Sequence, residues 1–209
     1  NIDNQTASNA NPTFFTEDSD HLTIRRNLIT FNNRYFNTSG LALYGLTYSL
    51  VEENEVYSMH RNVISINNGT NITTRNTGLI LRRNYYNSRA AADIPGGYVS
   101  GATGRGDDGI VLYPASDVIL ENNISEGNFG GFAIMAAYGL AADNKFYGNI
   151  SLNDSFGFKP VARIENPTGI QQMPQNTLIE NGIAINPVQI GFYLRDNKNT
   201  RLKNVTAIG

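Results

Sequence analysis

Two adjacent carboxylates, Asp107 and Asp108, stand just before a short apolar run and are the first candidates for acid–base chemistry in this chain. Of two neighbouring carboxyl groups, one can donate a proton while the other accepts one, and together they can hold a cation. Asp107 and Asp108 are therefore candidate catalytic residues. The alternative is that both lie in a solvated turn.

Lys159 and Arg163 form a second candidate catalytic pair. β-Elimination in a uronic acid polymer needs a basic group to remove a proton and a cation to neutralise the sugar carboxylate. Lys159 and Arg163 offer both functions at the start of a segment that contains Pro160, Pro167 and Pro174. The alternative is an exposed cation beside a proline-rich loop.

The sequence predicts no metal site and no cofactor. The chain lacks Cys and contains two His residues, His21 and His60, which are not at ligand spacing. Ca2+ is left open as a ligand of the Asp107 and Asp108 carboxylates, but the sequence shows no cluster of Asp residues suited to calcium to support it. His60 has Tyr57 and Arg61 close to it in the sequence, but it is better explained as a histidine in a turn.

Several aromatic residues are candidates for contact with sugar rings, because a flat ring can stack on the apolar face of a ligand. The predicted carbohydrate-binding residues are Tyr85, Tyr98, Arg105 and Tyr113. Tyr85 and Tyr86 are consecutive, so on a strand they must lie on opposite faces. By contrast Phe132, Phe158 and Phe192 each follow a recurrent Gly and are expected in the core.

The composition argues against nucleic acid and membranes as partners. The net charge is -2 and 16% of the residues are charged, so no strong field is present to recruit nucleic acid. No apolar stretch approaches the ~18 residues of a membrane span, and membrane insertion is not expected. A hydrophobic content of 40% favours an ordered chain.

The elements that must position these residues are repeated. An Asn returns about every 21 to 39 residues after a similar apolar and polar phrase, at Asn27, Asn54, Asn84, Asn123, Asn144, Asn181 and Asn204. Runs of three to five apolar residues bounded by Gly and Asn predict short strands. Stacked units let each strand pair in parallel with its equivalent in the next unit. The recurrent Asn is expected at a left-handed corner, where stacked amides can form a hydrogen-bonded ladder.

The segments Asp117–Ile134 and Ala141–Pro160 resemble the repeats of right-handed parallel β-helix proteins of the pectate-lyase-like superfamily. The resemblance implies an all-β fold, a right-handed parallel β-helix (solenoid) of about seven coils, formed by residues 1–209 as a single domain. Segments 85–108 and 159–176 break the period and are expected as lateral loops. We expect the chain to be a segment of a larger extracellular protein.

The match to any one enzyme family is incomplete. Gly106–Ile110 resembles the Gly-Asp-Asp segment of polygalacturonase-type hydrolases, but the expected Gly-His-Gly is replaced at Phe129–Phe132. The Trp-Ile-Asp-His phrase of pectate lyases and the Asp-Pro-His phrase of alginate epimerases are also absent. We therefore expect a secreted or cell-surface module that binds polysaccharide or cell-surface glycan, or acts as a rigid structural element.

The alternative is a polysaccharide-active enzyme, either a uronate-polymer lyase or a glycoside hydrolase, that uses Asp107, Asp108, Lys159 and Arg163. An uncapped end of a parallel solenoid exposes strand hydrogen-bonding groups, so end-to-end self-association is a further expectation.

Overall fold

The structure is a computed structural model that describes residues 2–4, 14–31, 40–57, 64–67, 76–87, 108–136, 140–161 and 173–209. Within these ranges the chain forms strands joined by tight turns. None of the described residues forms a helix long and apolar enough to cross a membrane.

Three long parallel sheets contain nearly all the strands. Sheet 1 consists of β2 (Phe14–Glu17), β5 (Leu41–Tyr44), β8 (Ile64–Asn67), β12 (Ile110–Leu112), β16 (Gly130–Met135), β19 (Phe156–Val161) and β22 (Ile190–Phe192). Sheet 2 consists of β3 (Thr23–Arg25), β6 (Leu50–Glu52), β10 (Ile80–Arg82), β14 (Ile119–Glu121), β17 (Lys145–Tyr147), β20 (Leu178–Glu180) and β23 (Arg201–Lys203). Sheet 3 consists of β1 (Ile2–Asn4), β4 (Leu28–Phe31), β7 (Glu55–Tyr57), β11 (Tyr85–Asn87), β15 (Ile124–Glu126), β18 (Ile150–Leu152), β21 (Ile183–Ile185) and β24 (Thr206–Ile208). A small fourth sheet pairs β9 (Asn76–Thr77) with β13 (Ala115–Ser116).

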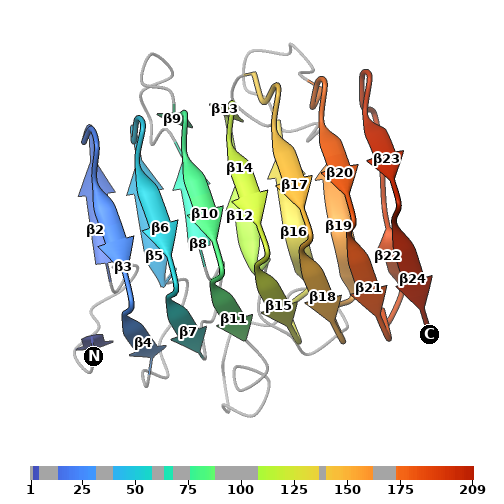
Figure 1. Ribbon diagram of the computed structural model, residues 1–209, viewed down its shortest axis with the longest axis horizontal. Helices are drawn as coiled ribbons and strands as arrows, with labels where there is room; N and C mark the ends of the chain where they lie inside the picture. The colour runs from blue at the N-terminus through green and yellow to red at the C-terminus, as the bar shows by residue number, and fades with distance from the viewer. Residues whose placement is uncertain are drawn as a thin grey trace.

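The chain visits sheets 1, 2 and 3 in turn and then repeats the circuit. Each strand pairs in parallel with its equivalents in the neighbouring coils, as in Ile80↔Leu50 and Ile80↔Ile119. Successive coils therefore lie side by side along one axis, with the two termini at opposite ends (Figure 1). The fold is a right-handed parallel β-helix, and the seven strands of sheet 1 and of sheet 2 define seven coils. The predicted fold class and number of coils are confirmed.

Inward-pointing side chains form the core in rows along the axis. The middle residue of each sheet 2 strand, from Ile24 to Ile179, is at most 5% exposed. In sheet 1 the Phe132 and Phe158 rings stack at 5.1 Å, and Phe158 stacks on Phe192 at 4.9 Å. Equivalent residues bury against one another because they occupy the same register position in adjacent coils. The predicted core positions of Phe132 and Phe158 are confirmed, and Phe192 is partly buried against the core.

The corner between sheets 2 and 3 contains a ladder of stacked Asn side chains. Along Asn27, Asn54, Asn84, Asn123 and Asn149, each backbone N–H donates to Oδ1 of the next Asn at 3.0–3.1 Å. The Nδ2 groups of the first four donate to the same oxygens at 2.9–3.0 Å. Asn54, Asn84, Asn123 and Asn149 are at most 2% exposed. The ladder thus satisfies buried polar groups that water cannot reach.

The left-handed residue at this corner is the one before the ladder Asn, which differs from the expectation. Arg26, Glu53, Arg83 and Asn122 have φ between 53° and 56°, and each precedes a ladder Asn. Asn181 and Asn204 occupy this left-handed position themselves and are exposed. Asn144 lies at a different corner, between sheets 1 and 2, where its Oδ1 accepts from the backbone N–H of Val118. The recurrent Asn residues therefore occupy three different positions: the ladder, the left-handed position before it, and the corner between sheets 1 and 2.

The period continues slightly further than the sequence indicated. Tyr85–Asn87 forms β11, and Lys159–Val161 belongs to β19. Tyr86 is fully buried while Tyr85 is only partly so, as expected for consecutive strand residues. The lateral loops expected from segments 85–108 and 159–176 lie mostly outside the described residues and stay a prediction.

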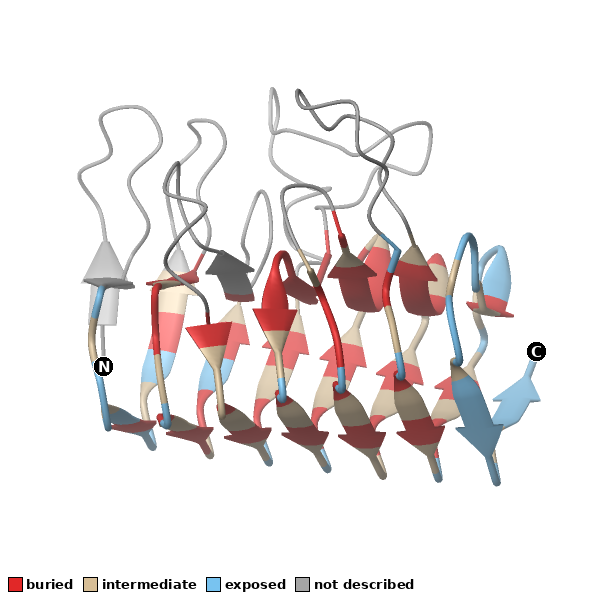
Figure 2. Cartoon of the chain, turned by 90° about the horizontal axis from the view of Figure 1, so that it is seen from above, coloured by how far each residue is buried: buried red, intermediate tan, exposed pale blue. Residues whose placement is uncertain are grey.

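The last coil differs from the interior ones. Leu202 occupies the inward row of sheet 2 but is 42% exposed, whereas Ile179 in the preceding coil is 0% exposed. The final strands β23 and β24 are accordingly pale blue in Figure 2. End-to-end association through such a face stays a prediction.

Candidate functional site: the outer face of sheet 1

Asp108 and Lys159, which come from the two different predicted catalytic pairs, meet on the outer side of sheet 1. The Nζ atom of Lys159 lies 2.6 Å from Oδ1 of Asp108, although 51 residues separate them in the sequence. The two side chains are 6% and 0% exposed. Asp108 is therefore not in a solvated turn, and Lys159 is not an exposed cation.

The strand register explains this meeting. Lys159 pairs with Ala133 and Ala133 with Val111, so Lys159 lies two coils beyond Asp108. The intervening coil has Gly130 at the level of Asp108. A Cβ atom at Gly130 would overlap Oδ1 of Asp108 and would lie 3.2 Å from Cε of Lys159. The absence of a side chain at Gly130 thus leaves the slot through which Lys159 reaches Asp108.

A row of aromatic rings runs along the helix axis beside this pair. The Phe129 and Phe156 rings meet edge to face at 5.3 Å, and Phe156 lies 5.2 Å from Tyr193. All three side chains are partly exposed. Nζ of Lys159 lies 4.8 Å from the centroid of the Phe129 ring, so the ammonium also contacts the π face. We call Phe129, Phe156 and Tyr193 the aromatic row.

A small apolar cluster adjoins the row on the same face. Val111, Tyr113 and Ala133 are buried and pack together, with Met135 against them. They form a group separate from the main core because alternate residues of a strand point to opposite faces of the sheet. Tyr113, a predicted carbohydrate-binding residue, is 5% exposed in this cluster. Its contact with a glycan stays a prediction.

Tyr85 lies elsewhere, on the outer face of sheet 3. Its hydroxyl donates to Glu126, and its ring centroid is 5.5 Å from that of Tyr57. Burial, with the nearby Glu55 carboxylate, raises the pKa of Tyr57 to about 12. Burial and the hydrogen bond to Glu126 also raise the pKa of Tyr85. Both phenols therefore act as hydrogen-bonding groups at neutral pH, and the structure does not bring Tyr85 to the Asp108–Lys159 pair.

The remaining predicted residues lie outside the described part of the chain. These are Asp107, Arg163, Tyr98 and Arg105, together with His60 and Arg61 of the weaker histidine group. Among the described residues, no three His, Asp or Glu side chains group closely enough to hold a metal ion.

The sequence interpretation missed Phe129 and Phe156, whereas Tyr193 is one of the aromatic residues that the sequence offers for contact with sugar rings. A signal was present: in successive coils Phe129 precedes the Gly130-Gly131 pair, and Phe156 precedes Gly157. The Phe that follows the glycine, at 132 and 158, is inward and takes the core position. Aromatic residues that flank the repeat Gly on the opposite side are therefore the ones to examine for surface function.

No protein-family model and no curated protein matches the sequence. Among solved structures, the fold is similar to the A-module of mannuronan C-5 epimerase AlgE4 from Azotobacter vinelandii, with a TM-score of 0.53 and 14% identity over 91% of this chain and 54% of that one. The A-module of mannuronan C-5 epimerase AlgE6 from the same organism matches with a TM-score of 0.43 and 10% identity, over 90% of this chain and 58% of that one. The chain thus spans little more than half the length of these structures. At 14% identity the likeness to the AlgE4 A-module shows the β-helix fold alone.

Proposed function

We propose that this β-helix is a secreted or cell-surface module that binds polysaccharide through the outer face of sheet 1. The observation that carries the proposal is the aromatic row, in which three partly exposed rings from consecutive coils follow one another at 5.3 and 5.2 Å. A linear polymer lying along the helix axis meets these rings in succession. Ring faces stack on the apolar faces of sugars, and partial exposure leaves them accessible.

The Asp108–Lys159 pair supports this role by fixing the row. Lys159 is anchored at one end by Asp108 and packs its ammonium over Phe129. Because the pair is buried, the Phe129 ring is held against a rigid support rather than on a mobile surface. A rigid aromatic surface loses little conformational entropy when a ligand binds.

Binding to a panel of neutral and acidic polysaccharides tests the proposal. We expect at least one polymer to bind the unaltered protein and to lose affinity in the double variant Phe156→Ala/Tyr193→Ala. Tyr48→Ala is the matched control, because Tyr48 is 64% exposed but lies in the second coil, away from the row. Equal affinity of the double variant and the control would contradict the assignment.

A second candidate function is enzymatic. The observation that favours it is the meeting of Asp108 and Lys159 from two separate predicted catalytic pairs. The similar AlgE4 A-module is named as a mannuronan C-5 epimerase. For Lys159 to abstract the C5 proton of a uronate, its ammonium would first have to give a proton to the Asp108 carboxylate, so that the neutral amine could accept the proton from C5.

Incubation with pectate, alginate and chondroitin separates the two functions. Unsaturated uronate, new reducing ends or a change of uronate stereochemistry that disappears in Lys159→Met would support the enzyme. For this comparison, circular dichroism must first show that the Lys159→Met protein is folded. Binding without any of these products supports the binding module.

A further inference from the structure

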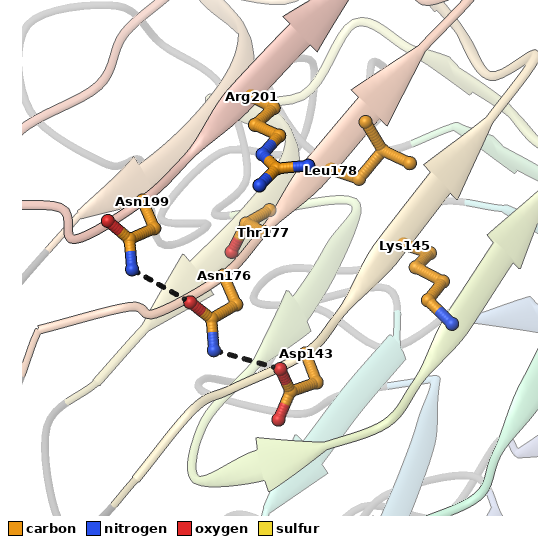
Figure 3. Close-up of a pocket in the computed structure, with 7 residues that line it drawn as sticks. All are labelled: Asp143, Lys145, Asn176, Thr177, Leu178, Asn199 and Arg201. Carbon is orange, nitrogen blue, oxygen red and sulfur yellow. Dashed lines mark hydrogen bonds between the residues drawn. The ribbon is translucent and has the colours of Figure 1, made fainter.

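A groove on the outer face of sheet 2 has the composition of a second ligand site. It has a volume of about 500 Å³ and is lined by Asp143, Lys145, Asn176, Thr177, Leu178, Asn199 and Arg201. These residues come from the last three coils, and they lie on a different sheet from the aromatic row. Figure 3 shows two roughly parallel lines of side chains, one from Asn199 to Asp143 and one from Arg201 to Lys145.

The first line is a chain of hydrogen bonds at the corner between sheets 1 and 2. Nδ2 of Asn199 donates to Oδ1 of Asn176 at 3.1 Å, and Nδ2 of Asn176 donates to Oδ1 of Asp143 at 3.0 Å. All three residues have left-handed φ values, between 53° and 59°, so their side chains leave successive coils in the same direction. The wall is thus ordered and polar, and it is exposed to solvent.

The second line places two cations on either side of an apolar residue. Lys145 pairs in register with Leu178, and Leu178 with Arg201. Two strand spacings separate the cations, or ~10 Å between their backbones. Within the described part of the chain, neither Lys145 nor Arg201 forms an ion pair.

The neighbouring outward row of the same sheet behaves differently. There Arg82 pairs with Glu52 at 2.8 Å, and Lys203 pairs with Glu180 at 2.5 Å. The row that contains Lys145 and Arg201 is occupied in earlier coils by Leu50, Ile80 and Ile119. The two cations therefore replace apolar residues in the last coils without acquiring acidic neighbours in their row. Asp143 is the one acidic residue among those that line the groove.

We propose that this groove binds an acidic glycan, with the carboxylate or sulfate groups of the sugar chain at Lys145 and Arg201. Charge-assisted hydrogen bonds from Lys and Arg suit both oxyanions. Leu178 offers an apolar floor to a sugar ring, and the amide wall offers hydrogen bonds to hydroxyl groups. Because the cations stand two coils apart, the ligand is an extended chain along the helix axis and not a free anion.

The test measures affinity by calorimetry for three probes: oligogalacturonate, which carries carboxylates; a sulfated glycosaminoglycan, which adds sulfates; and a neutral cello-oligosaccharide. We expect an acidic probe to bind, and its affinity to fall about tenfold or more in Lys145→Ala/Arg201→Ala. The affinity should also depend less on salt concentration in that variant, because fewer screened charges contribute. Oligogalacturonate binding identifies carboxylate as sufficient, and binding restricted to the glycosaminoglycan identifies sulfate.

Lys198→Ala is the matched control, since Lys198 is exposed in the last coil but does not line the groove. It should change the affinity less than twofold. All the altered side chains lie on the surface, and thermal unfolding checks that each variant is folded. The inference is overturned if no acidic probe binds, if the neutral probe binds equally well, or if the double variant binds like Lys198→Ala.

Binding in the groove on sheet 2 can be tested separately from binding at the aromatic row on sheet 1. Phe156→Ala leaves the groove unchanged, so loss of acidic-glycan binding in Phe156→Ala alone, with Lys145→Ala/Arg201→Ala unaffected, would assign that binding to the aromatic row and overturn the inference.

Discussion

The corner between sheets 2 and 3 and the outer face of sheet 1 contain two opposite kinds of order. At the corner the same side chain recurs in coil after coil, and each Asn bonds to the next in the same way. On the outer face of sheet 1, Asp108, Gly130 and Phe156 occupy one level in three successive coils and are three different residue types. The corner therefore repeats one residue type, whereas the outer face has different residue types in successive coils.

This difference between the corner and the outer face separates residues that stabilise the fold from residues that are candidates for function. The ladder stabilises the solenoid because five successive coils contribute equivalent links, so its residues are fixed by the repeat. Among the described residues, the Asp108–Lys159 pair and the aromatic row have no equivalent in the other coils. Their placement is local, which is why we assign them to the proposed function.

The largest effect is expected from breaking the buried ion pair. Lys159→Met leaves the Asp108 carboxylate buried without its cation and should destabilise the protein by about 3–5 kcal/mol. Urea unfolding measures this loss. The double variant Asp108→Ala/Lys159→Met should be more stable than Lys159→Met, because it no longer buries a carboxylate from which the Lys159 cation has been removed. A double variant that is no more stable than Lys159→Met would show that the pair acts by packing alone.

A slightly smaller loss is expected in the ladder. Asn123→Leu deprives Asn84 of the acceptor for two hydrogen bonds and should cost about 3 kcal/mol, the sum of several unsatisfied buried groups. Asn181→Gly is the control from the same sequence repeat. Asn181 is exposed with φ 55°, a conformation that Gly adopts freely, so its unfolding midpoint should barely change. Similar losses at both positions would contradict the distinction between ladder and corner residues.

The sequence predicted the repeating part of the molecule well. Asn27, Asn54, Asn84 and Asn123 form the ladder that their spacing indicated, and Phe132 and Phe158 lie in the core. Asn181 and Asn204 were misplaced by one residue, and Asn144 lies at another corner. An Asn at the left-handed position and an Asn in the ladder are adjacent in sequence, and both satisfy the same local preferences.

The site was less predictable for a different reason. Asp108 and Lys159 were each identified, but their contact depends on the register of three strands and on the empty position at Gly130. The register of the strands cannot be derived by counting residues along the sequence, because some of the intervening segments differ in length from the repeat. Phe129 and Phe156 were missed because an outward Phe precedes, and an inward Phe follows, the same one or two glycines, and composition alone does not distinguish them.

A third prediction concerns the slot at Gly130. Gly130→Ala introduces a methyl group into the space of the Asp108 carboxylate and should destabilise by about 1–3 kcal/mol. The cost should be smaller in an Asp108→Ala background, where the obstructing oxygen is gone. Thermal or urea unfolding of the four proteins provides this coupling, and equal costs in both backgrounds would disprove the proposed slot.

The smallest effect is expected from exposed charges at the corner between sheets 2 and 3. The Arg26 side chain, assisted by Arg83, holds the pKa of Glu53 below its ordinary value of 4.5. A lowered carboxyl pKa contributes stability above the ordinary value, and this contribution is lost as the pH falls through the folded-state pKa. The unaltered protein should therefore lose more stability than Glu53→Gln between about pH 5 and pH 3. Parallel melting curves over that range check the sign.

We propose above all that the aromatic row on the outer face of sheet 1 carries the function, and that the recurrent Asn residues of the ladder do not. The most direct measurement is the affinity of Phe156→Ala and of Tyr48→Ala for a polysaccharide that the unaltered protein binds and that Lys145→Ala/Arg201→Ala binds equally well. We predict a loss of about tenfold, or ~1.4 kcal/mol, for Phe156→Ala. Tyr48→Ala should retain full affinity. An unchanged affinity in Phe156→Ala, or equal losses in the two variants, would contradict the account.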